Sequence, residues 1–302
     1  MKGYEALRSA SAWVDLSARG RIRATGEDRA RLLHAMSTNH IQELPPGQGR
    51  YAFFLSAQGR IQADAILLCR VGDFLILTEP ETRRKLYEHL ERYIIADDVT
   101  LVDVTDQTAE LAVEGPQSAG TLRALGAPIP ENDFEAAEWG PRLVIRFDDE
   151  RYRVVTPLAD RADLTARLGD EADYEAWNVT RLERGLPRYG DDITDRHLVQ
   201  ETRQLHAVHF SKGCYLGQEI VERVRSRGQV HKGLAPIEIE SLTPFPPGAE
   251  ILNEAGTKAG ELMSNAYSPA FGRVVGLAYF RLEQLARPEA PLVVAGHPAR
   301  LR

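Results

Sequence analysis

Short apolar runs separated by turn residues mark the first hundred positions of the chain, and this pattern is typical of β-strands. Tyr51 to Leu55 and Ile61 to Cys69 flank the turn pair Gln58-Gly59, and Phe74 to Thr78 follows Gly72-Asp73. The spacing predicts a hairpin followed by a third strand.

A helix is predicted directly after these strands. Pro80 suits the first turn of a helix, and Leu86, Leu90 and Tyr93 follow at three- and four-residue spacing. Val99 to Asp103 then returns as a strand. We therefore expect the first third of the chain to mix helices and strands.

A related succession occurs again further along the chain. The expected strands are Glu110 to Glu114, Leu143 to Phe147 and Tyr152 to Thr156, with helices from Pro116 and near Leu164. Strands in adjacent hairpins, without strict alternation of strand and helix, favour an α+β fold over a doubly wound parallel sheet.

From Gly233 onward the runs become shorter and are separated by prolines and glycines, as in Pro246-Pro247-Gly248. Short strands at such spacing are typical of a small all-β barrel. The expected domains are therefore an α+β domain over 1–105, a second α+β domain over 106–232, and a barrel over 233–302.

The composition describes an ordinary globular chain. Of 302 residues, 43% are apolar, and 37 basic against 44 acidic side chains give a formal charge of −7. The longest apolar stretches are far shorter than the roughly 18 residues of a membrane-spanning helix, and no apolar signal core follows Lys2. We expect a cytoplasmic protein with no membrane association.

The cysteine count limits the metal chemistry. Two cysteines, Cys69 and Cys214, cannot supply the four thiolates that usually hold an iron–sulfur cluster or a structural zinc ion. Of the eight histidines, five are candidate ligands and show no ligand spacing with cysteines or acids: His34, His40, His206, His209 and His231. We expect no resident metal site, so any cluster would have to be shared with a partner.

The densest group of chemically distinctive residues runs from Phe210 to Glu219. Cys214 lies between glycines, Lys212 stands two positions before it, and the apolar spacing predicts a helix just after it. A nearby cation and a helix N-terminus both favour the thiolate, which indicates a reactive cysteine. The alternative is a small hydrophobic residue in a turn. Cys69, at the end of an apolar strand, is expected in the core.

Two carboxylates elsewhere are candidates with ordinary alternatives. Glu183 stands at the end of a helix that Gly185 should stop, where a carboxylate opposes the helix dipole. Ion pairing with a neighbouring arginine, Arg181, Arg184 or Arg188, would also explain it. Asp64 lies in a strand on the face opposite Ile61 and Ala63, and the strand pattern alone predicts that it faces solvent.

Lys212 to Glu219 reads K-G-C-Y-L-G-Q-E and resembles the K-G-C-Y-x-G-Q-E signature of the YgfZ family of folate-binding proteins, relatives of the glycine-cleavage T-protein (aminomethyltransferase). Four further segments resemble the family. They are Leu32 to Asn39 (L-L-x-x-x-x-T-N), Leu55 to Asp64 (L-x-x-x-G-x-I-x-x-D), Val113 to Pro116 (x-x-G-P) and Arg181 to Asp192 (R-x-E-x-G-x-P-x-Y-G-x-D).

The resemblance implies an α+β, T-protein-like ring of three domains, two mixed α/β domains and a C-terminal small β-barrel, with tetrahydrofolate or a one-carbon derivative in a central channel. It implies a monomer that works with iron–sulfur client proteins or their assembly machinery in cluster assembly or repair, with a link to tRNA modification but no direct nucleic-acid contact. Lys212 and Cys214 would carry the chemistry. The residues expected to bind folate are Glu183, Asp64, Tyr189, Tyr215 and Arg223.

The side chains suit such a ligand. A pterin ring presents an amide N–H beside an exocyclic amine, and one carboxylate such as Glu183 can accept both. The glutamate tail of folate is anionic, so Arg223 and the basic residues near it, Arg225, Arg227 and Lys232, are candidates to receive it. A solvated basic surface is the alternative.

Two further functions follow from the same residues. A folate-dependent aminomethyl (one-carbon) transferase would use Asp64, although T-proteins carry two aspartates where this chain has Ala63-Asp64, and they lack the signature cysteine. A cysteine hydrolase would pair Cys214 with His231 or His209, but the sequence offers no third group to orient the histidine.

Overall fold

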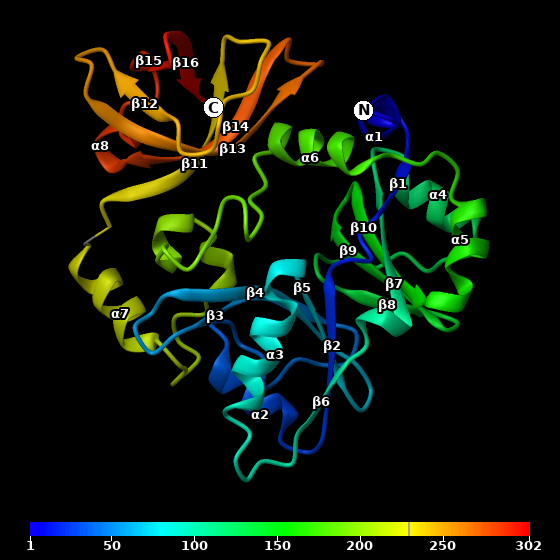
Figure 1. Cartoon of the computed structure of the whole chain (residues 1–302). Helices are drawn as coiled ribbons and strands as arrows, with labels where there is room; N and C mark the ends of the chain where they lie inside the picture. The colour runs from blue at the N-terminus through cyan, green and yellow to red at the C-terminus, as the bar shows by residue number, and fades with distance from the viewer. Residues whose placement is uncertain (229) are drawn as a thin grey trace. The chain divides into compact units, whose positions relative to one another are not determined.

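The structure is a computed structural model that describes residues 1–228 and 230–302, with every side chain in these ranges except that of Arg227. The chain forms two compact units (Figure 1). Unit 1 contains Met1–Ala57, Gln62–Trp177 and His206–Leu216, and unit 2 contains Gln58–Ile61, Asn178–Leu205 and Gly217–Arg302.

The first sheet of unit 1 has five strands in the order β3-β4-β5-β2-β6. Its strands are β2 (Gly20–Thr25), β3 (Gly49–Leu55), β4 (Ile61–Cys69), β5 (Phe74–Thr78) and β6 (Thr100–Asp103). Helices α2 (Arg29–Met36) and α3 (Arg83–Glu91) cover one face of this sheet through Leu33, Leu86 and Leu90, which are buried against it.

The second sheet of unit 1 has the order β1-β7-β10-β9-β8. Its strands are β1 (Ala12–Asp15), β7 (Thr108–Glu114), β8 (Ala136–Trp139), β9 (Arg142–Asp148) and β10 (Arg151–Pro157). Helices α4 (Ser118–Ala124) and α5 (Arg161–Arg167) cover its outer face with Leu122 and Leu164. Helix α1 (Tyr4–Ser9) precedes β1.

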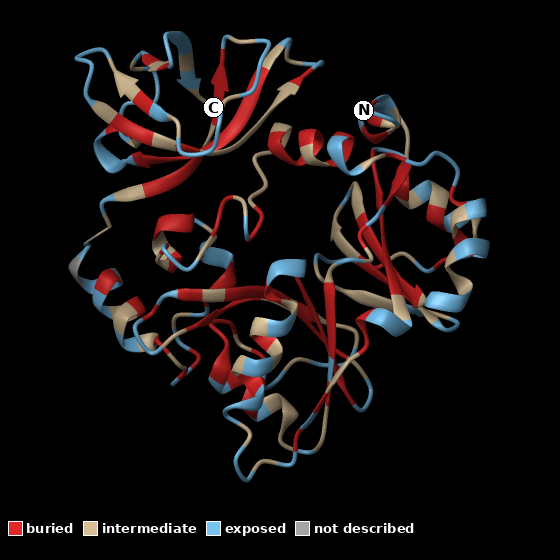
Figure 2. Ribbon diagram, viewed as in Figure 1, coloured by how far each residue is buried: buried red, intermediate tan, exposed pale blue. Residues whose placement is uncertain are grey.

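The two sheets of unit 1 pack against each other through their remaining faces. Ile66, Leu77, Ile145 and Val155 belong to one buried apolar cluster that joins β4 and β5 to β9 and β10. Unit 1 is therefore layered as helices, sheet, sheet, helices. Because both faces of β4 and β5 are covered, these strands are buried along nearly their whole length (Figure 2).

A cluster of buried charges lies among the strands of unit 1. Glu110 on β7 is fully buried, and its carboxylate lies 3.5 Å from Arg19 Nε, 3.7 Å from Arg21 Nη1 and 3.8 Å from Arg153 Nε. Arg21 belongs to the first sheet and Arg153 to the second, so one carboxylate serves arginines of both sheets. Burial lowers the pKa of each of these two guanidinium groups.

Unit 2 contains a closed barrel of six strands in the order β11-β14-β13-β12-β15-β16. The strands are β11 (Lys232–Ile239), β12 (Glu250–Asn253), β13 (Lys258–Ser268), β14 (Arg273–Arg281), β15 (Leu292–Val294) and β16 (His297–Leu301), with the short helix α8 (Leu282–Leu285). Ile237, Ile251, Val274 and Phe280 fill its interior, which accounts for the apolar alternation along β11 and β14.

The remaining helical segments lie between these elements along the chain. They are α6 (Tyr174–Glu183), α7 (Gln218–Arg227) and the 3₁₀ turns η1 (Pro80–Thr82), η2 (Thr105–Gln107), η3 (Leu158–Asp160), η4 (Val199–Thr202) and η5 (Leu205–Ala207). Across the described parts of the chain, no helix combines the length and apolar character needed to cross a membrane.

The α+β class and the C-terminal barrel expected from the sequence are confirmed. The hairpin, the helix after Pro80 and the helix after Cys214 are also present. Strands β1, β2, β8, β12 and β16 were not expected, because they are short or carry charged residues. β1 pairs with β7, Trp13 opposite Val113, so a boundary at residue 105 would separate this strand from its own sheet.

We predict that Glu110→Gln lowers the free energy of unfolding by about 3–5 kcal/mol, because it leaves buried arginines without their shared carboxylate. Urea denaturation of the full chain measures this. The control is Glu88→Gln, which removes the partner of Arg84 from an exposed pair (2.6 Å) and should change stability by less than about 1 kcal/mol. If both substitutions lowered the free energy of unfolding equally, Glu110 would contribute no more to stability than the carboxylate of an exposed ion pair.

Candidate functional site

The C-terminal end of α2 is capped by the segment that carries the K-G-C-Y signature. Lys212 Nζ donates to the backbone oxygens of His34 and Ser37, the latter at 2.5 Å, and Leu216 N donates to Ala35 O at 3.0 Å. The last carbonyls of a helix lack partners within it, and the helix dipole favours a cation there. The signature segment is thus tied to α2 at two points.

His34 completes this contact from the helix side. Its Nδ1 accepts from the backbone N–H groups of Ile41 and Gln42, both at 3.2 Å, so the ring proton resides on Nε2. Nε2 then donates to Lys212 O at 3.0 Å. Burial lowers the pKa of His34, which keeps the ring in this neutral form. His34 and Lys212 each bind the other's backbone oxygen.

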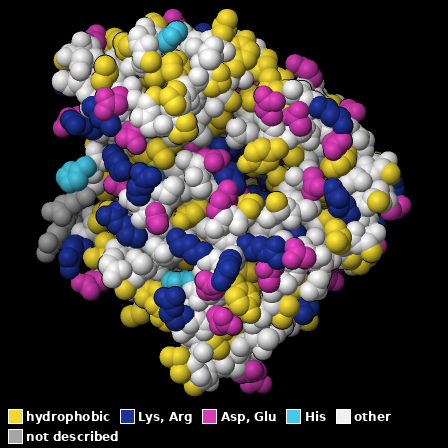
Figure 3. Space-filling view, in the orientation of Figure 1, with side chains coloured by type: hydrophobic (Ala, Val, Ile, Leu, Met, Phe, Trp, Pro, Cys, Tyr) yellow, Lys and Arg dark blue, Asp and Glu magenta, His cyan; other side chains and the backbone are white. Residues whose placement is uncertain are grey.

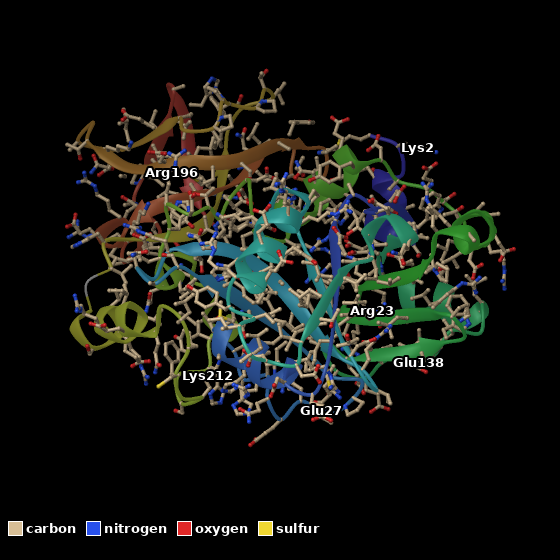
Figure 4. All side chains as sticks on the ribbon, turned by 60° about the horizontal axis from the view of Figure 1, so that its bottom comes forward. Lys2, Arg23, Glu27, Glu138, Arg196 and Lys212 are labelled. Carbon is tan, nitrogen blue, oxygen red and sulfur yellow. The ribbon has the colours of Figure 1, made fainter. Side chains whose placement is uncertain are left out.

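Lys212 is 7% exposed, and its ammonium lies 4.9 Å from the centre of the Tyr215 ring. This is a cation–π contact. Burial lowers the pKa of Lys212 to about 7. The contacts of this amine are with helix carbonyls and an aromatic ring, so it holds the loop in place (Figure 4 labels Lys212).

Cys214 is exposed on this anchored loop. Gly213 and Gly217 have φ angles of +92° and +82°, which residues with side chains rarely adopt. The two glycines therefore turn the chain sharply on either side of the thiol. Gly217 is also the N-cap of α7, so the helix expected after the cysteine begins at Gln218. Cys69, in contrast, is buried in β4.

Asp64 on β4 is 7% exposed, so the expectation that it faces solvent is wrong. Both faces of its sheet are covered, whereas the prediction from the strand pattern required one face of the sheet to be exposed to solvent. Its carboxylate accepts a hydrogen bond from Tyr51 at 2.8 Å, and the Tyr51 ring stacks on His206 with centroids 5.5 Å apart. Burial, and then the Asp64 carboxylate, raise the pKa of Tyr51.

Polar side chains just after α2 hold the segment that precedes the signature. Thr38 Oγ1 donates to Ala207 O at 2.6 Å, and Asn39 Nδ2 donates to both His206 O and Tyr51 O at 2.9 Å. The T-N pair, the hairpin strand β3 and the segment before Cys214 therefore meet in unit 1. The sequence assigned no role to His34 or Tyr51, because neither stands in a recognisable spacing.

Glu183 is the last residue of α6, and it is half-buried. Ser268 Oγ of β13 donates to its Oε1 at 2.5 Å. Arg181, one of the arginines considered as its partner, pairs with Asp192 at 2.7 Å. Serines in strands follow no pattern that sequence reasoning could use, so the contact of Ser268 was not foreseen.

Asp192 organises the turn after α6. It is fully buried and accepts hydrogen bonds from Arg181, from Arg188 N at 3.0 Å and from Ser264 Oγ. Tyr189, within this turn, is 6% exposed and forms an isolated backbone β-bridge with Ile193. The segment expected to bind folate in unit 2 is thereby held rigidly, with Glu183 at its beginning.

Arg223 lies on α7, is exposed and pairs with Glu219 at 2.9 Å. Arg225 pairs with Glu222 at 3.5 Å, whereas the side chain of Arg227 lies outside the described residues. The predicted residues thus fall into two groups. Unit 1 holds Asp64, Lys212, Cys214 and Tyr215, and unit 2 holds Glu183, Tyr189 and Arg223. Among the described residues, no three His, Cys, Asp or Glu side chains are placed to hold a metal ion.

Two family models each match one part of the chain. Residues 2–141 match the GCVT N-terminal domain, and residues 231–302 match the CAF17 C-terminal beta-barrel domain. The structure also matches that of the glycine cleavage system aminomethyltransferase T from Bartonella henselae, with a TM-score of 0.89 and 20% identity, over 99% of this chain and 86% of that one. This match confirms the T-protein-like fold.

The curated relatives include aminomethyltransferases, an iron-sulfur cluster assembly factor and tRNA-modifying proteins. The aminomethyltransferase of Rubrobacter xylanophilus is 29% identical over 91% of this chain and 77% of its own. The iron-sulfur cluster assembly factor IBA57 of Mus musculus is 29% identical over 90% of this chain and 78% of its own. The tRNA-modifying protein YgfZ of Yersinia enterocolitica is 26% identical over 70% of this chain and 66% of its own.

We predict that iodoacetamide alkylates Cys214 at least about tenfold faster than Cys69 in the native protein at pH 7.5. Cys214 is exposed, whereas Cys69 is 8% exposed and burial raises the pKa of its thiol. Mass spectrometry of timed samples measures both rates, and urea-unfolded protein, in which the difference should nearly vanish, is the control. Similar native rates would refute the prediction.

Proposed function

Because the chain belongs to the YgfZ family related to the glycine-cleavage T-protein, we propose that it serves the assembly or repair of iron–sulfur proteins. In this role it is a tetrahydrofolate-binding accessory factor, and Cys214 is its functional thiol. Its partners are iron–sulfur client proteins or assembly machinery, including enzymes that modify tRNA. The names of the YgfZ and IBA57 relatives support this role.

The observation that carries the proposal is the exposed Cys214 on a loop that Lys212 and Leu216 tie to α2. A thiol in a fixed, accessible position can meet a protein-bound cluster or a disulfide without the loop first having to be ordered. Two cysteines in the chain are too few to keep a cluster. The thiol therefore acts on clusters or thiols that belong to a partner.

The folate part of the proposal rests on Glu183. Its carboxylate is half-buried at the rigid start of the 183–192 segment, and Ser268 orients it from β13. A fixed carboxylate that reaches solvent suits the paired N–H donors of a pterin ring. Tyr189 and Arg223 of the same unit are the further proposed folate residues, and Asp64 and Tyr215 are those of unit 1. Bound tetrahydrofolate would supply a reduced pterin able to carry a one-carbon group.

A second candidate is a folate-dependent aminomethyl transferase, which the aminomethyltransferase relatives and the buried Asp64–Tyr51 pair favour. Ala63 stands where T-proteins carry an additional acid, which argues against it. Turnover of an aminomethyl-lipoyl carrier protein by the purified chain decides between the two. Measurable transfer would establish the enzyme, and absence of transfer with intact folate binding would leave the accessory role.

We predict that Glu183→Gln weakens tetrahydrofolate binding by about 1.5–3 kcal/mol, because a charge-assisted pair becomes a neutral one and the amide brings unwanted donors. Titration calorimetry measures the affinity, and circular dichroism checks the fold. The matched control is Glu240→Gln, an exposed carboxylate of the same unit, which should bind as the wild type does. Unchanged affinity of the Glu183 variant would remove this residue from the site.

We predict that Cys214→Ala leaves tetrahydrofolate affinity within a factor of about 3 of the wild type, since the change is small and the thiol does not hold the pterin. In a host that lacks its own factor of this kind, the variant should fail to restore iron–sulfur enzyme activity under oxidative stress. Cys69→Ala is the matched control and should restore it. Full rescue by Cys214→Ala would show that the thiol is dispensable.

A further inference from the structure

A cavity of about 190 Å³ lies against the wall of the barrel in unit 2. Residues of β11 and β14 alternate between the barrel interior and its outside, and Phe280 fills the interior. Tyr279 and Arg281 are therefore on the outer face. The Tyr279 ring stacks on His197 with centroids 4.1 Å apart, and this stack, 3% and 4% exposed, forms one wall of the cavity.

Two cations oppose each other at this cavity. Lys232 on β11 and Arg281 on β14 are directly paired positions of neighbouring strands, and both line the cavity. Like charges at such positions repel each other and destabilise the pair. In the described part of the chain neither side chain forms an ion pair with a carboxylate, and the Lys232 ammonium lies 4.8 Å from the centre of the Tyr279 ring. Figure 3 shows basic side chains, dark blue, beside acidic ones, magenta, on this part of the barrel near α8.

The other two charged groups that line the cavity, Lys258 and Glu261, pair with each other at 3.0 Å. Glu250, which does not line the cavity, lies 3.3 Å from Lys258. Burial, followed by the cations Lys232 and Arg196, lowers the pKa of His197 to about 4, so its ring is neutral. Among the residues that line the cavity, Lys232 and Arg281 therefore leave an excess of two positive charges.

The two rings that form this wall are neutral and carry polar groups. His197 Nδ1 accepts from Thr194 N at 3.1 Å, so the ring proton resides on Nε2. Burial, with Glu201 and Asp192 nearby, raises the pKa of Tyr279, and its buried hydroxyl has no hydrogen-bond partner among the described residues. The cavity thus combines an excess of positive charge with a wall of neutral rings that carry N–H and O–H groups.

We propose that this cavity binds a phosphate group, either as inorganic phosphate or as the end of a small phosphomonoester. A phosphate dianion matches the two excess charges and relieves the repulsion between Lys232 and Arg281. The volume is that of about six water molecules, which is below the roughly 300 Å³ where pockets for drug-sized ligands begin. The lining contains neither Glu183 nor Tyr189, so the site is separate from the one proposed for the pterin.

An adjoining cavity offers space for the rest of a phosphomonoester. It measures about 290 Å³, shares Lys258 and Arg281 with the first, and continues to Asn253 and Arg287. A ligand whose phosphate lies between Lys232 and Arg281 can place its organic part there. Inorganic phosphate would occupy the first cavity alone. Binding of a phosphomonoester should therefore depend on Arg287, whereas binding of inorganic phosphate should not.

Titration calorimetry of the full chain at pH 7.5 and constant ionic strength tests the site with three probes: inorganic phosphate, glycerol 3-phosphate and glutarate. We expect saturable binding of a phosphate probe, with at least about tenfold weaker binding in Lys232→Gln and in Arg281→Gln. Tighter binding of glycerol 3-phosphate that weakens in Arg287→Gln identifies the monoester as the source. Equal binding of both phosphates, insensitive to Arg287→Gln, identifies inorganic phosphate. Glutarate binding as tight as phosphate would overturn the assignment.

Thermal unfolding gives an independent readout. Without phosphate, Lys232→Gln should melt at or above the wild-type temperature, because it removes the repulsion. Added phosphate should raise the melting temperature of the wild type but not that of Lys232→Gln. Arg300→Gln, a barrel arginine that pairs with Glu238 at 2.7 Å outside this cavity, is the control and should keep the full phosphate effect. No phosphate effect on the wild type, or an equal loss in Arg300→Gln, would refute the proposal.

Discussion

The buried carboxylate of Glu110 is the constraint on which unit 1 depends. Arginines from both sheets approach it, at 3.7 Å for Arg21 and 3.8 Å for Arg153, in surroundings from which water is excluded. Buried charges are tolerated only when they are compensated, so the two sheets must keep the separation and register that bring these groups together. Burial of the apolar cluster stabilises the packing of the two sheets against each other. The buried charges determine the separation and register at which the sheets pack.

This arrangement determines how the candidate site is built. With both faces of the first sheet covered, Asp64 is enclosed and finds Tyr51, and α2 lies on the outer side with its last carbonyls directed at Lys212. The signature loop is therefore ordered through the contacts of its Lys212 and Leu216 with α2. It is held by an element whose position the layered core has already defined, and Cys214 remains exposed at a fixed place.

Sequence reasoning recovered the elements with clear periodicity, including β4, β5, α3 and the helix after Cys214, and it recovered the family from the K-G-C-Y signature. It did not recover the burial of Asp64, because a strand pattern does not show that a second sheet covers its other face. It also missed Ser268 and His34, whose contacts join segments far apart in the chain. Local patterns carry no information on such distant pairs.

The pairing of β1 with β7 has a consequence for biosynthesis. Ala12 cannot pair until Glu114, about a hundred residues later, has been synthesised, so β1 can join the second sheet only after that point. A growing chain on the ribosome completes the strands of the first sheet while its own N-terminal strand still lacks a partner, so that strand is exposed to misassembly for several seconds of translation. A cut at 105 therefore leaves β1 on one fragment and its partner strand β7 on the other.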